Sequence, residues 1–225
     1  MAARIDHLVI AAATLEQGVA WCEATLGVVP APGGEHPLMG THNRVLRIAT
    51  VDYPRAYLEI IAIQPGRTPQ RPRRWFDLDD ETVRDALARG GPRLLHFVAS
   101  VPDVRAAVNA WQSLRIDRGE PAAASRMTPR GLLAWQITVR DDGQRLFQGA
   151  LPTLIEWGET HPASALPESG VTLQALTATH PQAASLRNAY EAIDLQGVSV
   201  REGRPDVCAV LETPRGRLQL TSEGL

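Results

Sequence analysis

The sequence contains no lysine, so all 23 of its basic residues are arginines. This absence excludes enzymes that hold pyridoxal phosphate or a substrate as a lysine Schiff base, and it excludes nucleotide-binding loops that need a lysine. Together with the many alanine, arginine, glycine and proline residues, it is typical of a GC-rich bacterial genome.

The net charge is small, cysteines are few, and long apolar runs are absent from the sequence. The arginines are balanced by 25 acidic residues, which gives a net charge of −2, so nucleic acid is not an expected partner. The two cysteines form neither a CxxC pair nor a disulfide framework. No apolar run approaches about 18 residues, and the first residues do not form a signal peptide pattern. We therefore expect a cytoplasmic protein without a membrane partner.

The 225 residues show a repeated order of one strand, one helix and three strands, written βαβββ. In the first unit a β-branched run predicts a strand at 5–11, and a helix follows between the cap Thr14 and the terminating Gly27. Its other strands are expected near 28–31, 45–51 and 56–63. The second unit has strands near 93–100, 132–139 and 152–157 around a helix at 102–114.

A third unit follows the same order, beginning with a strand at 171–179 and a helix after Pro181. The sequence therefore predicts an α+β fold of repeated βαβββ modules, two of which form a cupped sheet. The expected divisions are a first module at 1–66, a linker with a short helix at 67–91, a second module at 92–159 and a third module at 170–222. The third unit has no partner within the chain, so we expect it to cover a face of the sheet or to pair with its counterpart in a homodimer.

Four polar residues interrupt strands that are otherwise apolar. His7 and His96 lie in the first strands of the first two units, whereas Glu59 and Glu156 lie in their last strands. A buried carboxylate or imidazole needs a partner. If the two units pack as pseudo-symmetric halves, all four side chains converge on one divalent metal. The alternative is that some of them face solvent, as alternate residues do in antiparallel sheets.

Imidazole and carboxylate ligands together suit zinc, nickel, cobalt, manganese or ferrous iron. Two of each would neutralise the charge of the ion and leave one or two positions open for water or substrate. The sequence alone does not choose among these metals.

The repeats and the positions of their His and Glu residues resemble the vicinal oxygen chelate superfamily, which includes glyoxalase I, extradiol dioxygenases and methylmalonyl-CoA epimerase. More narrowly, the chain resembles the glyoxalase-like domain family. The motifs that carry this resemblance are IDHLVIA at 5–11, GGEHP at 33–37, MGTHN at 39–43, YLE at 57–59, Ser125-Arg126, Gly131, Trp135, LPTLIEWG at 151–158 and TPRG at 213–216.

The resemblance implies a His or Gln ligand on each first strand and a Glu ligand on each last strand, here His7, Glu59, His96 and Glu156. It implies a divalent-metal-dependent isomerase, lyase or epimerase that forms an enediolate from a small oxygenated molecule, with Glu59 or Glu156 as the general base. Two alternatives stay open, namely a non-catalytic protein that sequesters a small molecule and an extradiol dioxygenase.

Further candidate substrate contacts lie in the segment 33–44 and in the second unit. The segment would place His36, Thr41 and Asn43 at the rim of the cup, unless it is a loop whose side chains cap their own backbone. Arg126 would pair with a carboxylate or phosphate of the ligand, or form a surface ion pair. The remaining candidates for the pocket lining, which core packing would explain equally well, are Trp135 and Trp157.

Overall fold

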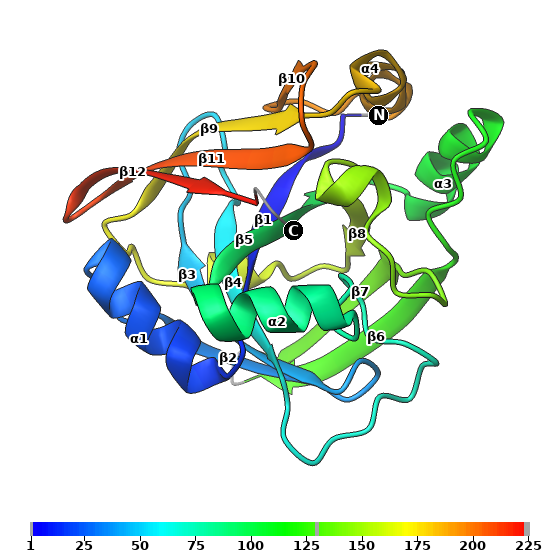
Figure 1. Cartoon of the computed structure of the whole chain (residues 1–225). Coiled ribbons are helices and arrows are strands. Elements are labelled where there is room, and N and C mark those ends of the chain that lie inside the picture. The colour runs from blue at the N-terminus through cyan, green and yellow to red at the C-terminus, as the bar shows by residue number, and fades with distance from the viewer. Residues whose placement is uncertain (1, 129–130, 223–225) are drawn as a thin grey trace.

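A computed structural model of the chain describes residues 2–128 and 131–222. Its central element is an eight-stranded sheet with the order β2-β3-β4-β1-β5-β8-β7-β6 (Figure 1). The first half consists of β1 (Arg4–Ala11), β2 (Ala31–His36), β3 (Thr41–Arg47) and β4 (Tyr57–Ile63). The second half consists of β5 (Arg93–Ser100), β6 (Pro121–Thr128), β7 (Gly131–Thr138) and β8 (Thr153–Trp157).

The two halves of this sheet have the same internal order and meet where β1 and β5 pair antiparallel. In each half the first strand runs parallel to the last, β1 with β4 and β5 with β8. The arrangement confirms the predicted α+β fold in which two βαβββ units form one cupped sheet.

Two helices, α1 (Leu15–Leu26) and α3 (Val104–Ser113), follow the first strands of the two halves and pack on one face of the sheet. Thr14 caps α1 by accepting a hydrogen bond from the backbone N of Gln17 at 3.1 Å, and Gly27 ends the helix in the left-handed conformation, as predicted. In α3 the indole of Trp111 is fully buried and donates to the backbone oxygen of Ala189 at 2.7 Å.

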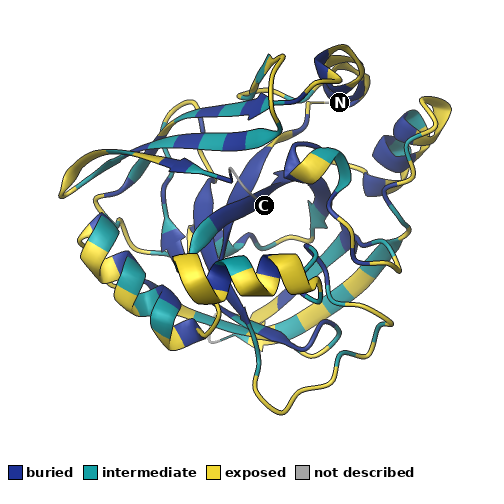
Figure 2. Cartoon of the chain, viewed as in Figure 1, coloured by how far each residue is buried: buried dark blue, intermediate teal, exposed yellow. Residues whose placement is uncertain are grey.

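The third unit forms a separate four-stranded sheet over this same face. Its elements are β9 (Thr172–Thr179), α4 (Ala183–Ala192), β10 (Ser199–Arg201), β11 (Asp206–Thr213) and β12 (Gly216–Thr221). Buried and less buried residues alternate along β9 and β11, and the buried residues join the core beneath α1 and α3 (Figure 2). The third unit therefore covers a face of the large sheet within one chain.

The third unit repeats the order of elements but not the order of strands. Its sheet has the order β10-β9-β11-β12, so its first strand pairs with the second and third strands of the unit, whereas β1 and β5 each pair with the last strand of their own half. Sequence periodicity predicts the succession of elements, but it does not fix which strands become neighbours.

The opposite face of the large sheet carries a smaller core. The helix α2 (Glu81–Gly90) buries Val83 and Leu87 there, beside Phe76 and Leu78 of the preceding connection. The short helices η1 (Leu146–Gly149) and η2 (Pro162–Ser164) flank β8 in the chain. This face is only partly filled, and it holds the candidate site described below.

Two local expectations from the sequence were wrong. The segment 33–44 was expected to be a connecting loop but forms most of the β2–β3 hairpin, and no strand was expected at β6. Glycine, proline and alanine, which have low strand propensity, make up four of the six residues of β2 and four of the eight residues of β6. Both β2 and β6 are edge strands of the sheet, so pairing with one neighbour holds them.

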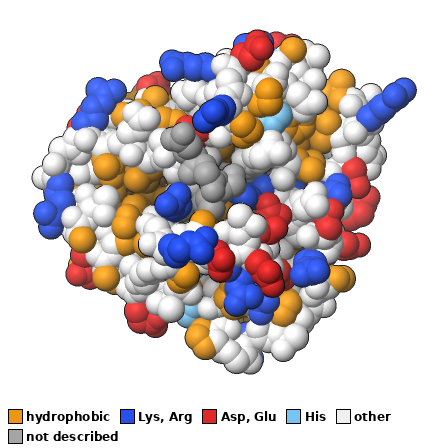
Figure 3. All heavy atoms as spheres, in the orientation of Figure 1, with side chains coloured by type: hydrophobic (Ala, Val, Ile, Leu, Met, Phe, Trp, Pro, Cys, Tyr) orange, Lys and Arg blue, Asp and Glu red, His pale blue; other side chains and the backbone are white. Residues whose placement is uncertain are grey.

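The surface of the chain carries both signs of charge. On the face seen in Figure 3, acidic and basic side chains are interspersed. Among the described residues, no helix has the length and apolar character needed to cross a membrane.

Candidate functional site

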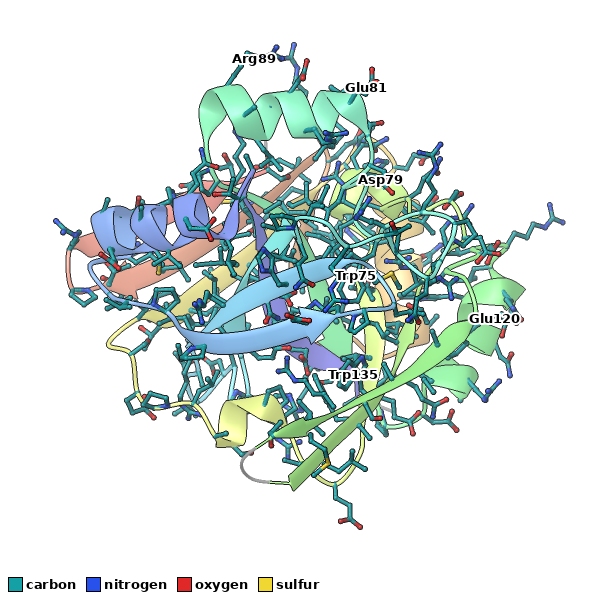
Figure 4. The ribbon with its side chains drawn as sticks, turned by 90° about the horizontal axis from the view of Figure 1, so that it is seen from below. Trp75, Asp79, Glu81, Arg89, Glu120 and Trp135 are labelled. Carbon is teal, nitrogen blue, oxygen red and sulfur yellow. The ribbon has the colours of Figure 1, made fainter. Side chains whose placement is uncertain are left out.

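A cavity of about 690 Å³ lies on the face of the sheet opposite the third unit. It is bounded by the β2–β3 hairpin, the β6–β7 hairpin and the connection after β8. Figure 4 shows Trp75 and Trp135, which both line it, near the middle of the molecule. A smaller cavity of about 50 Å³ shares these two tryptophans as walls and reaches His7 and Glu59.

Asp6 on β1 anchors the polar groups beneath this cavity. Its side chain is fully buried, and it lies where the pairing of β1 with β5 shifts register. The carboxylate accepts hydrogen bonds from His7 Nδ1 at 2.7 Å, Trp157 Nε1 at 2.8 Å and His161 Nε2 at 2.9 Å. Burial opposes its ionisation, but the hydrogen bonds and positive charge of His161 and His7 outweigh burial and lower the pKa of Asp6 to about 2.

The ionised Asp6 fixes the orientation of His7. Because a carboxylate can only accept, Nδ1 of His7 carries the proton of this hydrogen bond and Nε2 faces the cavity. The ring of Tyr57 stacks on His7 with 4.5 Å between centroids and restricts its rotation. His7 is thus held with one free nitrogen toward a ligand.

Glu59 on β4 lies beside that free nitrogen. Its Oε2 is 3.6 Å from Nε2 of His7, and both side chains are buried. Its Oε1 accepts from Nδ2 of Asn43. The backbone N of Gly34 donates to Oδ1 of Asn43 at 2.7 Å, so the amide is oriented with its hydrogens toward Glu59.

His36 lines both cavities, and Thr41, which lines neither, is its hydrogen-bonding partner. Nε2 of His36 lies 3.9 Å from Oε1 of Glu59, and its Nδ1 lies 3.1 Å from Oγ1 of Thr41. Burial lowers the pKa of His36 to about 4, although the charge of Glu59 opposes this change, so the ring is neutral near pH 7. His36 and Asn43 therefore lie beside Glu59, and Thr41 contacts His36.

His96, the counterpart of His7 in the second half, has no free nitrogen. Its Nδ1 lies 2.9 Å from the backbone oxygen of Gly149 and donates to it, and its Nε2 accepts from the backbone N of Thr153 at 3.0 Å. Burial, aided by the charge of Arg118, holds the pKa of His96 well below its usual value. This histidine is a neutral core residue that joins β5 to the connection before β8.

Glu156 points to the other face of the sheet. Its Oε2 accepts from the backbone N of Val104 at 2.8 Å, at the first residue of α3. Strand register explains why: Glu59 lies opposite Val9, two residues after His7, whereas the residue opposite Val98, two after His96, is Thr153. Thr153 therefore occupies in the second half the position that Glu59 occupies in the first.

The four residues predicted to bind a metal are consequently not brought together. His7 and Glu59 are neighbours, but His96 and Glu156 are engaged elsewhere. Asn43 directs amide hydrogens at Glu59, which is unsuitable where a cation would bind. Over residues 2–128 and 131–222 there is no group of three or more His, Cys, Asp or Glu side chains arranged to hold a metal ion. The residues present do not fit the metal that the resemblance implies.

The other predicted contacts lie near the cavities. Arg126 and Trp135 line both cavities, and Trp157 lines the smaller one while its indole binds Asp6. Asp6 and His161 were not among the residues predicted from the sequence. Asp6 could have been identified from the sequence, because it is a second polar residue beside His7 in an apolar strand. His161 lies in a linker, where no sequence pattern points to a functional residue.

Comparisons with known proteins agree with this architecture. A family model described as a glyoxalase-like domain matches residues 5–193. A hypothetical protein from Staphylococcus aureus has a TM-score of 0.62 at 13% identity, with 91% of this chain and 88% of that chain covered. This structure supports the fold of nearly the whole chain.

Two further solved structures are more distant. A methylmalonyl-CoA epimerase from Streptomyces coelicolor, in complex with 2-nitronate-propionyl-CoA, has a TM-score of 0.41 at 20% identity, over 70% of this chain and 96% of that chain. The epimerase from Mycobacterium tuberculosis has a TM-score of 0.37 at 16% identity, over 72% and 91%. No curated protein matches the sequence.

Proposed function

The chain belongs to the glyoxalase-like domain family, and we propose that it is an enzyme that moves a proton at a carbon next to a carbonyl group. The observation that carries this proposal is the buried group of Asp6, His7 and Glu59 beneath the cavity, here called the Asp6–His7–Glu59 cluster. A carboxylate beside an oriented imidazole is the pair that such proton transfer needs.

In the proposed reaction, Glu59 is the general base. Its carboxylate takes the proton from the carbon, and the electron pair of the broken C–H bond moves to the carbonyl oxygen, which forms an enolate. Asn43 donates to Oε1 of Glu59 and leaves Oε2, the atom nearer His7, to accept the proton. Protonation of the same carbon on its opposite face by solvent water gives epimerisation, and Glu59 then releases its proton to solvent. Isomerisation needs a proton transfer from the hydroxyl of the neighbouring carbon to the enolate oxygen, after which Glu59 returns its proton to that neighbouring carbon.

His7 stabilises the developing charge on the substrate oxygen in this proposal. With a proton on Nε2 as well as Nδ1, the imidazolium donates a hydrogen bond to the enolate oxygen. Asp6 acts as a positioning residue, because its buried carboxylate orients the ring and stabilises its positive charge, as the aspartate of a serine protease triad does. No step is assigned to a metal, because the residues expected to bind one do not form a site.

A second candidate function is binding without catalysis. The observation in its favour is the large cavity, whose walls are mostly apolar and which is of the size that encloses a small molecule. A sequestering protein needs this cavity but has no use for the Asp6–His7–Glu59 cluster.

The experiment that separates the two functions is deuterium incorporation in D₂O. The intact protein is incubated with ketones and aldehydes that carry a second oxygen on the neighbouring carbon, and mass spectrometry detects exchange of the C–H bond. The proposal expects catalysed exchange in at least one such compound. Compounds that bind the protein but never exchange would overturn the enzymatic proposal in favour of sequestration.

A further inference from the structure

Arg126 on β6 carries a buried nitrogen that has no partner. Its Nη1 is shielded from solvent and makes no hydrogen bond. Among the described residues, no Asp or Glu forms an ion pair with this guanidinium, although eight other arginines form such pairs. A buried donor without an acceptor costs free energy, so this nitrogen is available to an acceptor from outside the chain.

The opposite edge of the sheet determines where the guanidinium of Arg126 can lie. A Cβ atom at Gly34 on β2 would lie 1.7 Å from Nη1 of Arg126, so a side chain at this position would displace the guanidinium. The two edge strands of the cupped sheet thus meet at this contact. Gly34 also donates to Asn43, which donates to Glu59, so the guanidinium and the general base are linked through two residues.

The cavity next to Arg126 has little other charge. The carboxylate of Glu35 pairs with Arg67 at 3.4 Å, and His161 binds Asp6. Most of the remaining surface is apolar, with contributions from Leu38, Met39, Trp75, Leu133, Trp135 and Leu166. A ligand that matches these walls has one anionic group and a larger apolar body.

From this arrangement we infer that the cavity binds a carboxylic acid with an apolar body, whose carboxylate pairs with Arg126. The inference deepens the proposed function and rests on it for the reacting carbon, because Arg126 also lines the smaller cavity with His7 and Glu59. A monoanion suits the site better than a phosphate dianion, because a single guanidinium is present and Glu59 repels a second negative charge.

Binding of simple probes tests this inference separately from turnover. Decanoate, 1-decanol and acetate are titrated into the intact protein by calorimetry, with the fluorescence of Trp75 and Trp135 as a second signal. Wild-type protein is expected to bind decanoate more tightly than 1-decanol, because only the acid satisfies Arg126. Acetate is expected to bind weakly, because it lacks the apolar body.

Substitutions then test whether Arg126 is the residue that pairs with the carboxylate of decanoate. Arg126→Met keeps the apolar stem and is expected to weaken decanoate binding about 10- to 100-fold while leaving 1-decanol binding unchanged. Gly34→Ala displaces the guanidinium and should act in the same direction. Arg89→Met, on the exposed side of α2, is the matched control and should bind like wild type.

Equal binding of decanoate and 1-decanol by wild type, or unchanged decanoate binding by Arg126→Met, would overturn the inference. These results do not depend on catalysis. Decanoate binding through Arg126 without any deuterium exchange would refute the proposed function alone, whereas exchange without preference for acids would refute the inference alone.

Discussion

The two halves of the large sheet carry a histidine on the first strand and a glutamate on the last, yet only the first half directs both into the cavity. His7 and Glu59 lie 3.6 Å apart beneath it. Both ring nitrogens of His96 form hydrogen bonds with backbone groups, and Glu156 binds the start of α3 on the far face. The same residue types on the first and last strands of two repeats therefore do not guarantee the same roles.

Strand register is the physical reason for this difference. Side chains alternate between the faces of a strand, so a displacement by an odd number of residues moves a side chain to the other face. Glu156 lies three residues after Thr153, the counterpart of Glu59. The first half directs its polar pair into the cavity, whereas in the second half His96 and Glu156 hold β5, β8 and α3 together.

Apart from substitution of the general base itself, the largest effect is expected from His7→Ala in the first half. Loss of the imidazole should lower turnover about 10²- to 10³-fold, because the substrate oxygen loses its hydrogen bond donor. Added imidazole should restore part of the rate, since the vacated space adjoins the smaller cavity. Steady-state kinetics measures both effects, and unchanged turnover in the folded variant would contradict the role of His7.

His96→Ala should instead affect stability. The variant leaves the backbone oxygen of Gly149 and the backbone N of Thr153 without their partner in the core, and it should lower the free energy of unfolding by about 1–3 kcal/mol. Chemical denaturation measures this loss, with the exposed variant Gln174→Ala as control. Turnover per folded molecule should stay close to that of wild type. A large fall in turnover with unchanged stability would assign His96 to the reaction.

The stabilisation by Asp6 should depend on pH. Its pKa falls from 3.8 to about 2 on folding, so the carboxylate stabilises the fold at pH above about 4, and this contribution is lost as the pH falls toward 2. At neutral pH the unfolding free energy of Asp6→Asn should therefore lie about 2 kcal/mol below that of wild type. Denaturation at a series of pH values should show the gap narrowing below pH 4. A gap that is constant with pH would mean that ionisation of Asp6 does not stabilise the fold.

The smallest effect is expected from Glu156→Gln. The amide oxygen can still accept from the backbone N of Val104, so only the interaction of the charge with the start of α3 is lost, at a cost of about 0.3–1 kcal/mol. Thermal unfolding measures this change. A loss of several kcal/mol would show that Glu156 does more than cap the helix.

Much of the fold could be predicted from the sequence, because apolar periodicity and caps such as Thr14 and Gly27 act locally. The pairing of His7 with Glu59 could also be predicted, since both interrupt apolar strands. The hydrogen bonds of His96 and Glu156 could not be predicted, because they depend on strand register and on backbone groups at Gly149 and Val104 that no local pattern reveals. The separate sheet of the third unit likewise depends on long-range strand pairing.

The most direct test compares Glu59→Gln with Glu156→Gln in the deuterium exchange assay, using one compound that wild type exchanges. Each variant makes the same chemical change, one in each half of the sheet. We expect Glu156→Gln to exchange at close to the wild-type rate and Glu59→Gln to lose exchange while still binding the compound. Loss of exchange in Glu156→Gln, or its retention in Glu59→Gln, would contradict the assignment of the reaction to the first half.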